Sequence, residues 1–114
     1  MSEDQAAEDQ PVWDPKLAER LHDKNVLIGL TYLTADGAIL DRRQMHGRVI
    51  LVDRHEGIRV RLDGAHAGEE FALPPDTRSW DPAPPGEYRL RETGELVIDP
   101  DFLTTWTIRK RASH

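Results

Sequence analysis

Residues 58–73, IRVRLDGAHAGEEFAL, carry the pattern that decides the fold. Apolar and charged side chains alternate in residues 58–62 and again in 69–73, and a period of two is typical of strands with one buried face. Folding the stretch about the loop at 63–68 creates three matched pairs: Val60 with Phe71, Ile58 with Leu73, and Arg61 with Glu70. Apolar then faces apolar and base faces acid, so the sequence predicts an antiparallel hairpin in this register.

Two longer strands are expected before this hairpin, joined by a tight turn. Residues 26–34, VLIGLTYLT, alternate and are rich in β-branched and aromatic side chains, and a second strand should occupy residues 38–53. Between them, Asp36-Gly37 indicates a hairpin turn, because glycine accepts the positive φ that tight turns need. A strand of such length must bend in a small domain, and we expect the bend at Gly47.

A short helix is predicted ahead of the first strand. Asp14 can accept hydrogen bonds from the amides of the first turn, and Pro15 suits the first helical position. The apolar residues of this helix share one stripe: Leu17, Ala18 and Leu21. Because so short a helix does not persist alone, we expect it to cover residues 49–52, VILV, which are apolar on both faces.

The second half of the chain should add a loop, a hairpin and a last strand. Residues 74–86 hold five of the eight prolines and surround Trp80, which predicts a stiff, irregular loop. We expect two apolar pairs in the hairpin that follows: Tyr88 with Ile98, and Leu90 with Leu96. Its loop would be residues 92–94, and residues 104–108 would form the final strand.

Together these elements predict a mainly β fold in a single domain. Residues 13–110 should form a small antiparallel barrel with a short N-terminal helix and a C-terminal β-hairpin extension. Residues 1–12 should precede it as a disordered acidic tail, because the first ten residues contain four acids and no base.

The order of the elements in residues 14–75 resembles the Sm-like (LSm) small barrel and, more generally, the SH3-like barrels. The resemblance rests on the helix, the Asp36-Gly37 turn, the Gly47 bend and the short third and fourth strands. It implies RNA binding and assembly through an exposed edge strand as family properties. Bacterial Sm-like RNA chaperones carry a Tyr-Lys-His-type signature where this chain has Leu73-Pro74-Pro75-Asp76. The whole chain also resembles small-barrel proteins of bacteria with no assigned activity.

Charge and composition narrow the classes of function. The chain has 15 basic and 21 acidic side chains, a net charge of −6, and without the first ten residues 17 acids face 15 bases. This balance argues against a dedicated nucleic-acid or anionic-membrane protein. The lack of cysteine excludes disulfides, thiolate zinc sites and cysteine nucleophiles. No apolar run approaches the ~20 residues of a membrane span, and the acidic start is unlike a signal peptide, so we expect a cytoplasmic protein.

Catalytic and metal-binding motifs are missing from the sequence. The five histidines lack the spacing of a zinc site, and His55-Glu56 begins a zincin-like pattern in which Arg59 stands at the position of the second histidine. Ser79, the one serine outside the two ends of the chain, has no Gly-x-Ser-x-Gly context. We therefore expect no enzyme, no cofactor and no metal site.

The binding candidates are four arginines and one tryptophan. Arg59 and Arg61 share one strand face, as do Arg89 and Arg91. If the two strands lie close together, the four form a basic patch for an acidic protein segment, a phosphate or RNA; ordinary pairing with cross-strand glutamates is the alternative. Trp80 on its stiff loop would be either a recognition platform or a plug for the open end of the barrel.

These observations predict a non-enzymatic cytoplasmic interaction module that binds a protein partner through the arginine face or the Trp80 loop. One alternative is Sm-like RNA binding, which the net charge and the missing signature disfavour. Another is a small immunity-type or regulatory protein that blocks a partner. Homo-oligomers fit the same fold, because edge strands can pair between copies.

Overall fold

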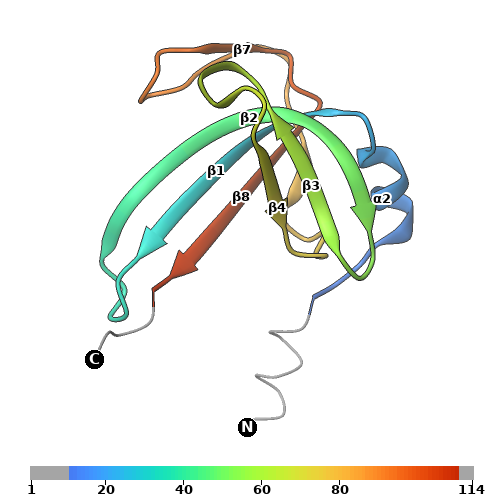
Figure 1. Ribbon diagram of the computed structural model, residues 1–114, viewed down its shortest axis with the longest axis horizontal. Coiled ribbons are helices and arrows are strands. Elements are labelled where there is room, and N and C mark those ends of the chain that lie inside the picture. The colour runs from blue at the N-terminus through green and yellow to red at the C-terminus, as the bar shows by residue number, and fades with distance from the viewer. Residues whose placement is uncertain (1–10, 111–114) are drawn as a thin grey trace, which may run out of the picture.

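Eight strands and one short α-helix make up residues 11–110, the part of the chain that the computed structural model describes (Figure 1). The helix α2 spans Pro15–Leu21, and a single 3-10 turn, η1, spans Gly64–His66. The strands are β1 (Asn25–Leu33), β2 (Ile39–Asp53), β3 (Gly57–Leu62), β4 (Glu70–Leu73), β5 (Trp80–Pro82), β6 (Glu87–Arg89), β7 (Leu96–Ile98) and β8 (Phe102–Arg109). The mainly β fold with one short helix is thus confirmed.

The acidic tail predicted for residues 1–12 lies outside the described residues except for its last two positions. Val12 is anchored to the domain, because its carbonyl accepts hydrogen bonds from the Thr77 amide at 2.9 Å and from the Thr77 hydroxyl at 3.1 Å. Val12, which the sequence analysis places in the tail, is thus hydrogen-bonded to the domain.

Six strands form one open sheet in the order β4-β3-β2-β1-β8-β5. Its pairs are antiparallel except for β1 and β8, which run parallel with Val26 opposite Phe102 and Leu33 opposite Arg109. The prediction that all pairing is antiparallel is wrong at this pair. Parallel neighbours need a long crossover, and the whole of β2–β7 supplies one. A bond from the Asp101 amide to the Asn25 carbonyl at 2.9 Å aligns the starts of both strands.

The hairpin of β3 and β4 has the register that the sequence predicts. Ile58 lies opposite Leu73, Val60 opposite Phe71 and Arg61 opposite Glu70. The long strand β2 arches strongly (Figure 1) and has a register shift against β3 between Val49 and Leu51. Gly47 lies just before this irregularity, and a Cβ there would come within 2.1 Å of the Arg61 carbonyl oxygen. Gly47 thus permits a close approach of β2 and β3 rather than supplying the bulge itself.

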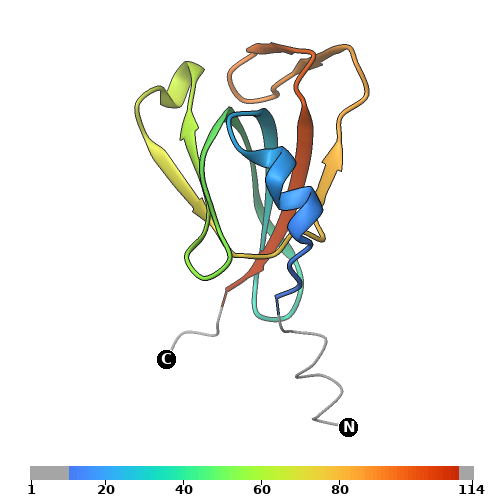
Figure 2. The same ribbon diagram turned by 90° about the vertical axis from the view of Figure 1, so that its right-hand side faces the viewer.

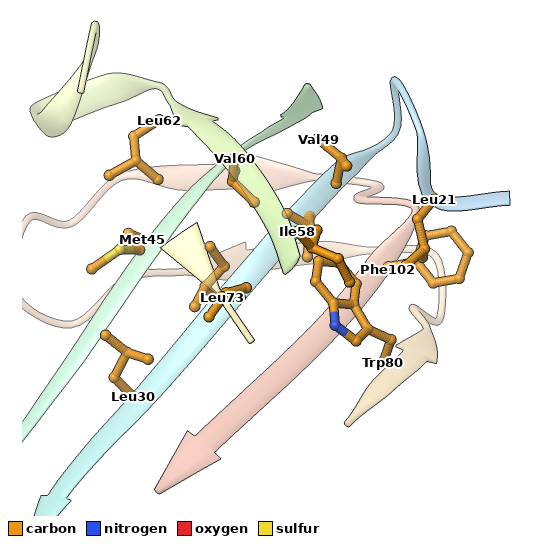
Figure 3. Close-up of a cluster of buried hydrophobic side chains, with 12 residues drawn as sticks. Leu21, Leu30, Met45, Val49, Ile58, Val60, Leu62, Leu73, Trp80 and Phe102 are labelled. Carbon is orange, nitrogen blue, oxygen red and sulfur yellow. The ribbon is translucent and has the colours of Figure 1, made fainter. Parts of the chain in front are cut away.

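The main core fills the inner face of the curled sheet. It gathers side chains from the helix and from all six strands of the large sheet (Figure 3): Leu21, Val26, Ile28, Leu30, Met45, Val49, Ile58, Val60, Leu62, Leu73, Trp80 and Phe102. A second, smaller cluster lies on the outer face, where Leu27 of β1 packs with Leu90 and Val97 of the β6–β7 hairpin. The small hairpin is therefore docked on the outside of the sheet.

Helix α2 begins where the sequence predicts. The Asp14 carboxylate accepts hydrogen bonds from the amides of Lys16 and Leu17 at 3.0 and 3.4 Å. The helix lies between the β3–β4 edge and the β5 edge of the curled sheet (Figure 2). Beyond its end, the Asp23 amide donates to the Val49 carbonyl at 2.9 Å, so the predicted contact between the helical segment and this part of β2 is present.

The hairpin β6–β7 forms in a register one residue away from the predicted one. Tyr88 lies opposite Val97, and the Leu90 amide donates to the Glu95 carbonyl at 2.8 Å, which closes a loop of residues 91–94. Residues 96–98 are all apolar, so alternation alone could not select the inward position. Packing against the outer face of the sheet selects Val97, which is 8% exposed, and leaves Leu96 and Ile98 outside.

Candidate functional site

Arg59 and Arg61 lie on the exposed face of β3 and face the same carboxylate. The Arg59 Nε is 3.9 Å and the Arg61 Nη2 is 3.6 Å from the oxygens of Glu70 on β4. This is the cross-strand pairing that the sequence left open as the alternative to a binding role. The single negative charge of Glu70 therefore compensates only part of the two positive charges of Arg59 and Arg61.

Arg89 ends strand β6 of a separate two-stranded sheet that does not pair with β3, and Arg91 lies in the loop between β6 and β7. Arg89 Nη1 donates to the Gly94 carbonyl at 3.1 Å, so this side chain closes its own hairpin loop. Arg91 instead lies beside β2, where its amide donates to the Gln44 Oε1 at 3.0 Å. The structure brings Arg59 together with Arg61, but it places Arg91 in the company of β2 residues that the sequence analysis did not single out.

A groove on the outer face surrounds Arg91, and we call it the arginine groove. Its volume is about 310 Å³, and its lining comes from β1, β2, β8 and the hairpin loop: Gly29, Leu30, Thr31, Arg42, Arg43, Gln44, Arg91, Glu92 and Thr105. Gly29 pairs with Gln44 on one side and with Thr105 on the other, and Thr31 pairs with Arg42. Small side chains on β1 and β8 leave the sheet surface hollow, while longer side chains on β2 and the loop form its rim.

The hairpin loop that carries Arg91 is fixed to the rest of the domain at both of its ends. Leu90, only 2% exposed, anchors it in the outer cluster. At the far end of the loop, a Glu95 carboxylate oxygen accepts a bond from the Ala65 amide at 2.8 Å and lies 3.7 Å from the His46 Nε2. Burial acts to raise the pKa of Glu95, but the Ala65 amide, the Thr93 hydroxyl and His46 together hold the pKa below its ordinary value.

The charges of the groove are only partly compensated. Arg43 Nε bonds to an Asp41 carboxylate oxygen at 3.1 Å, and this guanidinium, together with the Arg42 amide, lowers the pKa of Asp41. Within residues 11–110 no carboxylate lies in ion-pair range of Arg42 or Arg91, both of which are exposed. The groove is therefore lined by two arginines that form no ion pair within residues 11–110, together with one further carboxylate, Glu92.

Trp80 lies in the main core and not on the surface. It belongs to β5, pairs with Thr104 of β8 and is 2% exposed (Figure 3). The proline-rich segment predicted as an irregular loop thus contributes a short edge strand. The buried position argues against a recognition platform, which needs an exposed ring.

Two further features are absent from the part of the chain that the structure describes. Across residues 11–110, no three His, Asp or Glu side chains gather in a way that could hold a metal ion. The same residues contain no helix of the length and apolar character needed to cross a membrane.

Comparison of the chain with models of known protein families, with curated proteins and with solved structures gives no match. The candidate site is therefore judged on its own geometry. Of the residues that line the groove, the sequence predicted only Arg91 as a site residue; Arg42 and Gln44 are among those it did not predict. Gly29 and Thr31 are small residues at alternate positions of an otherwise mostly apolar strand, but the sequence does not show that Thr105 lies beside them.

Proposed function

We propose that this protein is a non-enzymatic interaction module that binds a protein partner by accepting acidic side chains in the arginine groove. The observation that carries the proposal is the placement of Arg42 and Arg91, without ion-pair partners in residues 11–110, on one hollow of about 310 Å³. Guanidinium groups bind carboxylates through paired, charge-assisted hydrogen bonds, which are stronger than neutral ones.

The groove is also held in shape before a ligand arrives. Arg91 is attached to β2 by the bond to Gln44, and its loop is anchored by Leu90 and Glu95. Arg42 lies in the part of β2, from Ile39 to Arg48, that pairs with β1. Because these elements are already ordered, binding loses less conformational entropy than it would on a free loop.

A relationship to the Sm-like or SH3-like barrels is part of the same proposal. Its support is the order of elements, in which α2 is followed by four sequential antiparallel strands and the second of them is long and bent. An Sm-like relative would use such a cationic surface for RNA, and phosphates of a single strand bind guanidinium groups as carboxylates do. The net charge of −6 counts against RNA, which carries one negative charge on every phosphate.

The test is an affinity purification from a lysate of the source organism with three forms of the chain: the unchanged protein, Arg42→Ser/Arg91→Ser, and Arg59→Ser/Arg61→Ser. The third is the matched control, because it removes the same two charges from a pair that already faces Glu70. Each capture is repeated after nuclease treatment, and the melting temperature of each variant is measured.

We expect a protein partner that survives nuclease treatment, binds the control variant and is lost with Arg42→Ser/Arg91→Ser. All three forms should melt alike, because exposed arginines contribute only about 0–1 kcal/mol to stability. Equal capture by both double variants would overturn the groove as the binding site. Capture that depends on nucleic acid, with binding that weakens steeply as salt rises, would favour the RNA alternative.

A further inference from the structure

The first half of β2 has a free edge beside the arginine groove. Strand β1 pairs with β2 from Ile39 to Arg48, whereas β3 joins only from Gly47 onward. Within residues 11–110, the edge from Ile39 to Met45 therefore has no strand on the side away from β1. Unpaired main-chain groups on such an edge can accept another strand.

Two hydrogen bonds show which residues direct their main-chain groups toward this edge. The Arg42 amide donates to the carboxylate of its neighbour Asp41 at 2.8 Å, and the His46 carbonyl accepts from the Asp63 amide at 2.8 Å. In an antiparallel strand, the amide and carbonyl of one residue point to the same side, and the side alternates along the chain. Gln44, halfway between these residues, therefore directs both its amide and its carbonyl outward.

We propose that an extended acidic segment of the partner adds to this edge of β2 as a further strand, with an acidic side chain at every second position. The inference rests on the proposed function, because it names how the acidic ligand of the arginine groove is held. Successive side chains of an added strand point to opposite faces of the sheet. Every second one would then lie on the outer face, on which Arg42, Gln44 and Arg91 are found.

Charge identifies the occupant of the edge. The exposed part of β2 carries Arg42 and Arg43 against one carboxylate, Asp41, so the same edge of a second copy would bring arginines together. Like charges opposite one another destabilise a strand pair, and opposite charges stabilise it. An added acidic strand would bring carboxylates to these arginines and hydrogen-bond the free main-chain groups of the edge. The Asp41 carboxylate now accepts a hydrogen bond from the Arg42 amide, but its side chain is exposed and can turn away to free that amide for the added strand.

The probes are two blocked synthetic heptapeptides of identical composition. One alternates, Glu-Thr-Glu-Val-Glu-Thr-Glu, and the other segregates its charge, Glu-Glu-Glu-Glu-Thr-Val-Thr. A third peptide repeats the alternating sequence with N-methyl groups on every second amide, which removes main-chain donors and keeps the charge. Binding to the ¹⁵N-labelled full chain is followed by amide shifts of Gly29, Gln44 and Arg91 and by hydrogen exchange of the Gln44 amide.

We expect the alternating peptide to bind about tenfold more tightly than the segregated one, which corresponds to about 1.4 kcal/mol, roughly the worth of one or two added hydrogen bonds. It should slow exchange at Gln44, and N-methylation should remove the advantage. Arg42→Ser/Arg91→Ser should weaken it, and Arg59→Ser/Arg61→Ser should not.

Two results would overturn the added strand. If both charged peptides shift Gly29 and Arg91 with equal affinity and leave Gln44 exchange unchanged, acids enter the groove without strand pairing, and the proposed function stands alone. If neither peptide binds, the added strand is likewise rejected, and the lysate capture decides separately whether the groove binds a partner.

Discussion

Replacing Gly47 with alanine is the sharpest available test of how β2 and β3 meet. The added Cβ would come within 2.1 Å of the Arg61 carbonyl oxygen, 2.8 Å of its carbon and 2.9 Å of the Leu62 Cα. All three atoms are main chain, so no side-chain rotation relieves the overlap. The two strands must therefore separate at the point where the sheet curls over its core.

The size of the effect follows from that separation. An ordinary contact requires the strands to move apart by about 1 Å, and the bond from the Asp63 amide to the His46 carbonyl, 2.8 Å long, would be lost with its neighbour in the ladder. Two backbone bonds at about 1 kcal/mol each, together with disturbed packing, give a loss of about 3 kcal/mol. The free energy of unfolding of a domain of this size is about 5–15 kcal/mol in total, so this loss of stability is large.

The matched control is Gly29→Ala in the neighbouring strand. A Cβ there meets only the Thr105 Cγ2, at an ordinary distance of 3.5 Å, and a strand interior favours alanine over glycine. Urea unfolding followed by tryptophan fluorescence should show a much lower midpoint for Gly47→Ala and an unchanged or higher one for Gly29→Ala. Equal midpoints for the two variants would refute the close approach of β2 and β3.

Two further changes test the core and its pH dependence. Val60→Asp should abolish folding, because Val60 is 0% exposed opposite Phe71 and an unpaired buried carboxylate costs about 4 kcal/mol or more; Ala72→Asp, on the exposed side of β4, should fold normally by circular dichroism. Arg78 holds the pKa of the buried Asp76 below its ordinary 3.8, so the ion pair stabilises the fold above that pH and ceases to do so as the pH falls through the lowered pKa. Asp76→Asn should lower the melting temperature at neutral pH, with a difference that shrinks in acid; a difference independent of pH would contradict this.

The sequence predicts the local pairings well wherever both strands alternate. Between β3 and β4, apolar and charged residues alternate on each side, so only one register buries Val60 with Phe71. In the β6–β7 hairpin, three consecutive apolar residues, 96–98, leave two registers with equal burial. The register is chosen by packing against Leu27 of β1, which is distant in the sequence, so the pattern of residues 87–98 alone does not reveal it.

The parallel pairing of β1 and β8 could not be predicted for a related reason. Alternation in residues 102–109 indicates a strand but says nothing of its direction or neighbour. The direction is set by a long-range contact, in which the Asn25 amide donates to the Asp101 carboxylate at 2.9 Å and the Asp101 amide returns a bond to the Asn25 carbonyl. Strand β5 was missed because it holds only three residues and obtains its stability from pairing with β8.

These long-range contacts also explain why the arginine groove was hidden in the sequence. Its floor exists because β8 places Thr105 opposite Gly29, and its rim exists because the hairpin loop brings Arg91 to β2. Neither contact leaves a local pattern in the sequence. The alternation of residues 88–91 therefore suggested that Arg91 shares a strand face with Arg89, whereas Arg91 lies in a loop beside β2. Since the loop is anchored at Leu90 through outer-face packing, the binding geometry is coupled to the docking of the hairpin on the sheet. A substitution that loosens the packing of the hairpin on the sheet should therefore weaken partner binding in the groove, even though Arg42 and Arg91 are unchanged.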